Sequence, residues 1–179
     1  SVYRNTSISG TISFAAKVDF VTRFGNRSIS IGDLNGDGKL DIIAATATVC
    51  LLRNTSTAGA ISFATRVDLP SGSSPASAEI ADIDGDGKPD IAIAHQGNDN
   101  VSVYRNTSTG GAISFAARVN FAAEDLTRFI KIGDLDGDGK PDIAALNNNN
   151  IGELTLLRNI SVPGTVNFEP KLNLPSGTS

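Results

Sequence analysis

Aspartates recur at alternate positions in three short stretches of this chain, and carboxylates so close together repel one another unless a cation lies between them. The third stretch, residues 133–142, reads GDLDGDGKPD. Counted from its first aspartate, carboxylates fall at positions 1, 3, 5 and 9, and the glycine at position 6 allows a sharp backbone turn. Position 7 would offer its backbone carbonyl. The pattern predicts an all-oxygen site for a hard cation.

The other two stretches share this spacing, except that the first has an asparagine at position 3. Oxygen ligands favour calcium over zinc or copper, and magnesium is disfavoured because it retains several waters. A single stretch could be a plain polar turn, but three copies weaken that alternative. We therefore predict three calcium sites. Their ligands, with each lysine contributing its carbonyl, are Asp33, Asn35, Asp37, Lys39 and Asp41; Asp82, Asp84, Asp86, Lys88 and Asp90; and Asp134, Asp136, Asp138, Lys140 and Asp142.

The residues that follow each stretch argue against an EF-hand. An EF-hand closes its loop with a bidentate glutamate at position 12, where this chain has Ala44, Ile93 and Ala145. Each position-9 aspartate leads directly into an apolar run, which is typical of a strand. The loops are therefore predicted to join two strands.

The acidic loops belong to a repeat of about 50 residues, because their first aspartates are 49 and 52 residues apart. A second marker, an aliphatic residue or tyrosine followed by Arg-Asn, recurs at 3–5, 52–54, 104–106 and 157–159. Each repeat has four strand patterns: one before the loop, one after it, one at the marker and one beyond it. A period of this length is typical of propellers or solenoids.

The fourth strand pattern is the clearest, as in AISFAARVNF at 112–121. Its period of two predicts that Ile113, Phe115, Val119 and Phe121 share one buried face. In the last copy Pro170 cannot donate to a ladder, so this strand should lie at a sheet edge. No segment has a helical period. The predicted fold class is all-β, built of β-propeller blades of four antiparallel strands.

The loops DLNGDGKLD, DIDGDGKPD and DLDGDGKPD, with the surrounding strand rhythm, closely resemble the FG-GAP or VCBS repeats of integrin-alpha-like β-propellers. The resemblance extends over essentially the whole chain and implies calcium in each loop. Since such propellers usually close with about six to eight blades, we expect a part of a larger propeller, with self-association through open edges as the alternative. The expected units are the two outer strands of a partial blade at 1–20 and three blades at 21–69, 70–121 and 122–179, with calcium loops 33–41, 82–90 and 134–142.

Charge and composition limit the class of partner. The chain has 15 basic and 19 acidic residues, and 11 of the acids lie in the predicted loops, so its acidity is local. No basic cluster is interleaved with aromatics, which argues against a nucleic-acid partner, and no apolar run is long enough to span a membrane. Cys50, the only cysteine, is expected to be a buried, inert thiol. Calcium sites of this kind fill at extracellular concentrations, so we expect an extracellular or cell-surface location.

Catalysis has no positive support in the sequence. His95 is the only histidine; it has no evident nucleophile partner and is expected in a loop after the second strand of its blade. The Asn-X-Ser/Thr triplets at the Arg-Asn markers are expected to be turn residues rather than glycosylation sites. We predict that the chain is not an enzyme.

The end of the blades opposite the calcium loops is the expected recognition surface, because its connections differ most between copies. Amide- and guanidinium-rich loops suit sugar hydroxyls or a protein surface, with solvated polar turns as the alternative. The leading hypothesis is a calcium-binding recognition module for carbohydrate or protein ligands. The propeller of a polysaccharide-degrading enzyme and a calcium-rigidified spacer are the alternatives. The candidate ligand-binding residues are His95, Asn98, Asn100, Arg128, Asn148 and Asn149.

Overall fold

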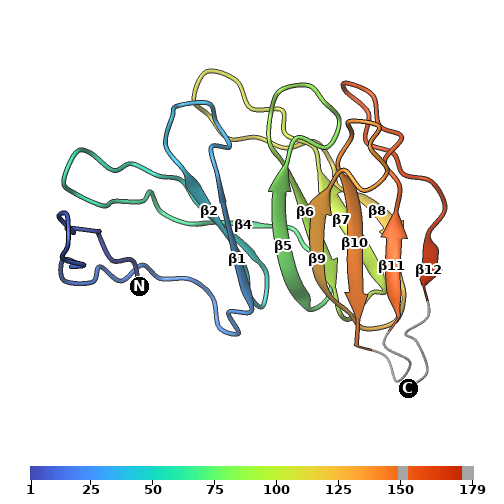
Figure 1. Ribbon diagram of the computed structural model, residues 1–179, viewed down its shortest axis with the longest axis horizontal. Helices are drawn as coiled ribbons and strands as arrows, with labels where there is room; N and C mark the ends of the chain where they lie inside the picture. The colour runs from blue at the N-terminus through green and yellow to red at the C-terminus, as the bar shows by residue number, and fades with distance from the viewer. Residues whose placement is uncertain (149–152, 175–179) are drawn as a thin grey trace.

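The computed structural model describes residues 1–148 and 153–174 and contains three four-stranded antiparallel sheets, with no helix among these residues. In each sheet the strands lie side by side in chain order, so each sheet is a meander (Figure 1). The all-β prediction with four-stranded antiparallel units is confirmed. The strands are β1 (Ser28–Gly32), β2 (Asp41–Ala45), β3 (Val49–Leu52) and β4 (Val67–Leu69); β5 (Pro75–Ala81), β6 (Asp90–His95), β7 (Asn100–Tyr104) and β8 (Val119–Ala122); and β9 (Thr127–Gly133), β10 (Asp142–Asn147), β11 (Leu154–Leu157) and β12 (Leu172–Leu174).

Each acidic loop joins the first and second strands of its sheet, as predicted. Because each sheet is an antiparallel meander, these loops and the turns between the third and fourth strands lie at the same end of their sheet, which is the upper end in Figure 1 for the second and third sheets. The first strands of neighbouring sheets are adjacent, because β1 packs beside β5 and β5 beside β9. The three sheets therefore fan out from a common inner side, as propeller blades do.

Two apolar clusters lie between the sheets and hold them together. The strand β6 contributes to both, with Ile91 and Ile93 facing the first sheet and Ala92 and Ala94 facing the third. Burial on both faces explains why this strand reads as a continuous apolar run. The other buried members include Ile43, Val49 and Leu51 in the first cluster and Val101, Val103, Ile130, Ile143 and Leu157 in the second.

The fourth strand of each sheet lies at the sheet edge as predicted, but it is shorter than expected. Val103 pairs with Val119 in the ladder, whereas the next bridge joins Asn106 to Phe115, which leaves one extra residue on the fourth-strand side. A one-residue shift turns the following side chains to the opposite face. Phe115 consequently packs against the first cluster and Phe121 against the second, so the prediction that they share a face was wrong.

Residues 1–20 form a hairpin held by three isolated bridges, not the two continuous strands that were predicted. Its apolar side chains are largely exposed: Ile12 is 84% exposed and Phe14 is 58% exposed. A two-stranded hairpin without a packed face is only marginally stable. The same isolated bridges recur at Asn54–Phe63, Asn106–Phe115 and Asn159–Phe168, so this irregular ladder is a feature of the repeat rather than of the first hairpin alone.

Cys50 lies in the middle of β3 and is fully buried, as expected. Burial raises the pKa of its thiol, which keeps it protonated and unreactive. Within residues 1–148 and 153–174, no helix is long and apolar enough to cross a membrane.

Candidate metal centres

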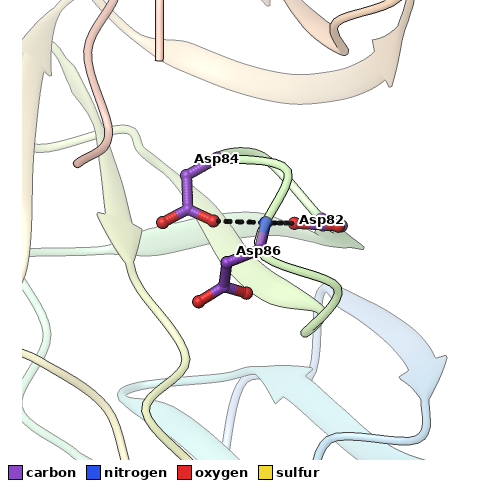
Figure 2. Close-up of side chains that lie close together, drawn as sticks. All are labelled: Asp82, Asp84 and Asp86. Carbon is purple, nitrogen blue, oxygen red and sulfur yellow. Dashed lines mark hydrogen bonds between the residues drawn. The ribbon is translucent and has the colours of Figure 1, made fainter. Parts of the chain in front are cut away.

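The second acidic loop brings three carboxylates together between β5 and β6. Oxygens of Asp82, Asp84 and Asp86 lie within 4.8 Å of one another, and Figure 2 shows the three side chains around the turn of the loop. Asp84 is only 3% exposed, so its charge has little access to water. Three carboxylates at this separation supply the hard oxygen ligands that calcium prefers.

The backbone of this loop is wound around its first aspartate. Asp82 Oδ1 accepts hydrogen bonds from the Gly85 and Asp86 N–H groups at 2.9 and 3.1 Å, and Oδ2 accepts one from the Gly87 N–H at 2.9 Å. Both glycines have positive φ, 73° and 86°, a conformation that other residues rarely adopt. The sequence argument used only the glycine at position 6. It missed the one at position 4, although every copy of the loop contains it.

In the third loop an arginine neutralises part of the carboxylate cluster. Oxygens of Asp134, Asp136 and Asp138 also lie within 4.8 Å of one another. Arg158 forms ion pairs with Asp136 and, at 2.9 Å, with Asp138, and the first of these lowers the pKa of the Asp136 carboxyl. Arg105 approaches Asp86 of the second loop at 3.7 Å in the equivalent way. In the second and third sheets the arginine of the Arg-Asn marker is thus a counter-charge to the acidic loop, a role that was not predicted from the sequence.

The first loop has two carboxylates where the others have three, because Asn35 occupies position 3. Its amide Nδ2 donates to Asp37 Oδ2 at 3.1 Å and to the Gly111 carbonyl at 2.9 Å. Asn35 Oδ1 accepts the Asp37 N–H at 3.2 Å. The first loop therefore has the same shape with one negative charge fewer.

The position-9 aspartates connect each loop to the segment that directly follows the third strand of its own sheet. Asp90 Oδ1 accepts the Asn106 N–H at 2.7 Å and its Oδ2 accepts the Ile83 N–H at 2.9 Å. Burial raises the pKa of Asp90 to about 6, against the effect of these backbone donors. Asp41 and Asp142 make the same pair of contacts in their own loops. These carboxylates lie outside the triplets, and each oxygen keeps a second lone pair that a cation could use.

The asparagine of the Arg-Asn marker links one sheet to the acidic loop of the sheet before it. Asn106 Nδ2 donates to the Leu34 carbonyl at 2.9 Å and to the Pro89 carbonyl at 2.7 Å. Its Oδ1 accepts the Ser108 N–H at 2.8 Å, which is an Asx turn. Asn159 repeats these contacts in the third sheet. The Asn-X-Ser/Thr sequences at Asn106 and Asn159 are therefore turn residues, as predicted. The contacts that their asparagines make between sheets were not predicted.

His95 is placed differently from the prediction of a loop residue. It is the last residue of β6, it is fully buried, and neither ring nitrogen has a hydrogen-bond partner among the described residues. Burial, with a smaller contribution from Arg118, lowers its pKa to about 4. The continuous pairing of β6 with β7, which includes His95 opposite Asn100, extends the strand beyond the sequence prediction.

The remaining recognition candidates do not form one site. Asn98 lies beside His95: a Cβ at Gly72 would be 3.0 Å from Asn98 Oδ1 and 3.1 Å from His95 Nδ1. Asn100 begins β7 and is half-buried, and Asn148 is exposed after β10. Arg128 lies in β9 and lines a separate cavity. Asn149 lies outside the described residues.

The comparisons with known proteins agree with this repeat structure. A search of curated proteins found no match. The model of the FG-GAP-like repeat matches three consecutive segments, residues 1–44, 43–93 and 82–145, which together cover most of the chain. The chain therefore belongs to the FG-GAP-like repeat family.

Proposed function

We propose that this chain is a calcium-binding recognition module of an exported or cell-surface protein, and that it binds rather than transforms its ligand. The observation that carries the proposal is the carboxylate triplet in the second and third loops, each with its oxygens within 4.8 Å of one another. Calcium at positions 1, 3, 5 and 9 and at the position-7 carbonyl would neutralise the triplets and stiffen the end of each sheet.

The three loops should differ in affinity. The second and third triplets offer three carboxylates each, whereas the first offers two and an amide that is already bonded to its neighbours. Because calcium affinity rises with the number of charged ligands, the first loop should be the weakest of three sites. Filling at extracellular calcium levels is the reason for proposing an exported protein.

Calcium titration of the intact chain, followed by calorimetry and thermal melting, tests the proposal. We expect each occupied site to add about 1.4 kcal/mol of stability at a free calcium concentration ten times its Kd. Asp84→Asn combined with Asp86→Asn should remove one site. Asp125→Asn, an exposed acid outside the loops, is the control and should remove none. Unchanged calorimetry and melting at millimolar calcium would show that the loops are only turns.

Recognition is assigned to the end of the sheets opposite the acidic loops. Connections there differ between repeats, whereas the loop end repeats the hydrogen bonds of the position-9 aspartate in all three acidic loops, a difference that supports recognition at the variable end. A glycan array probed with the calcium-loaded chain would test a carbohydrate ligand. Product release from a polysaccharide would instead favour the propeller of an enzyme. The absence of both binding and product release would favour a spacer.

A further inference from the structure

A cavity of about 380 Å³ opens where the inner strands of the three sheets begin, at the end opposite the acidic loops. Its lining combines two guanidinium groups, two amides, a small apolar side chain and an aromatic ring. The cavity is within the size range of small-ligand sites. The lining residues are Asn26, Arg27, Ala76, Gln96, Arg128 and Phe129.

Three of these residues occupy the same position of the repeat. Arg27, Ala76 and Arg128 each lie six residues before the first aspartate of their own acidic loop. β1, β5 and β9 are adjacent strands (Figure 1), and the three residues line one cavity at the start of these strands. The middle sheet has the smallest side chain, so a hollow remains between two arginines.

Neither arginine has a carboxylate partner within the described part of the chain. Arg27 Nη1 donates to Gln96 Oε1 at 3.0 Å, and the Arg128 guanidinium lies 5.6 Å from the centre of the Phe129 ring. Arg23 and Arg158, by contrast, are both paired with acids. Two guanidinium groups without carboxylate partners in one cavity make a positive site on a chain of net charge −4.

We propose that this cavity binds the carboxylate of an acidic saccharide, a uronic acid unit. The guanidinium fork matches a carboxylate with two parallel hydrogen bonds. The Asn26 and Gln96 amides can both donate to and accept from ring hydroxyls, and the half-exposed Phe129 ring offers an apolar surface beside them. The inference rests on the proposed recognition function and specifies its ligand.

The test is calorimetric titration of the calcium-loaded chain with an oligomer of glucuronic acid and with its methyl ester, which has the same ring but no charge. Binding should favour the acid and weaken as salt is added. Arg27→Gln and Arg128→Gln should each weaken it by about tenfold. The double variant Arg27→Gln/Arg128→Gln is compared with a control that combines Arg4→Gln with Arg53→Gln, which removes the same two charges from side chains that make no ion pair among the described residues. The control should leave binding unchanged.

Each contrary result overturns the inference. Equal binding of acid and ester, no binding of the acid, or equal loss in the control variant would show that the arginines do not form the site. Equal binding of polyglutamate would overturn the saccharide assignment and favour an acidic protein ligand. Calcium stoichiometry and melting, measured on the same samples, report on the proposed function independently, because none of the four substitutions touches an acidic triplet.

Discussion

Replacing Asn106 with alanine should reveal how much the asparagine of the repeat contributes to holding neighbouring sheets together. The side chain is fully buried and makes three hydrogen bonds, to the Leu34 carbonyl of the preceding loop, the Pro89 carbonyl of its own loop and the Ser108 N–H. Alanine removes all three and leaves two carbonyls and one N–H without these partners.

The expected cost follows from the number of bonds lost. A buried hydrogen bond contributes about 1 kcal/mol, and leaving a partner unsatisfied costs as much or more, so Asn106→Ala should lower the free energy of unfolding by about 3 kcal/mol. Asn54 is the matched control. It keeps the contacts to Leu40 and Ser56 in its own sheet but makes no bond to a preceding loop in the described chain. Asn54→Ala should therefore cost at least about 1 kcal/mol less.

Urea unfolding of both variants at saturating calcium measures the difference, provided that the slope against urea is unchanged. Asn159→Ala should match Asn106→Ala, because Asn159 makes the equivalent bonds to the Ile83 and Pro141 carbonyls and to the Ser161 N–H. An Asn54→Ala variant as destabilised as Asn106→Ala would refute the reasoning, since the contact between sheets would then contribute nothing.

Three further predictions concern pH, backbone and metal. The pKa of His95 is lowered to about 4, so the unfolded chain takes up the proton first, near pH 6.5. The free energy of unfolding should fall by at most about 1.4 kcal/mol per pH unit as the pH drops from 6.5 to 4. His95→Leu should make the urea midpoint depend less on pH between pH 7 and 5, and an equal pH dependence in both proteins would contradict this. Gly139→Ala should cost about 1–2 kcal/mol because φ is 86°, whereas Gly133→Ala, at ordinary φ with open space around it, should be close to neutral by urea unfolding. Asp84→Asn should weaken the second site and Asp136→Asn the third, so calorimetry of the two variants should show that calcium binds more tightly to the second site. A tighter third site would contradict the expectation that the buried Asp84 makes the second site the stronger one.

The sequence was sufficient to predict the local elements of the fold. Alternation, turn residues and the recurring acidic loops predicted four-stranded antiparallel units with strands on both sides of each loop, and the structure has them. It was insufficient for the fourth strand, because alternation was followed across Phe115 and Val119 without seeing the extra residue between them. An alternating apolar pattern cannot reveal a bulge when the residues before it and the residues after it each keep the alternation.

The candidate site was predictable only as far as local spacing extends. Positions 1, 3 and 5 are close in sequence, so their convergence could be read directly. The contacts of Asn106 and Asn159 with a preceding loop join residues more than 70 positions apart. Such contacts depend on how one sheet packs on the next. For the same reason, the burial of His95 was not evident from a single histidine near the end of an apolar run.

Packing between sheets and the predicted metal centres are physically coupled. Asp84 accepts a hydrogen bond from the Gly164 N–H of the following sheet at 2.9 Å, and this carboxylate is buried. Asp136, at the same position of the third loop, has no following sheet within the described chain, is exposed, and is paired with Arg158 instead. A cation in the second loop would act where water is largely excluded, so its attraction to the carboxylates is screened least. In the third loop it would compete with Arg158. The following sheet thus determines how far the position-3 carboxylate of the preceding loop is buried, and of the two carboxylate triplets the second is the more buried.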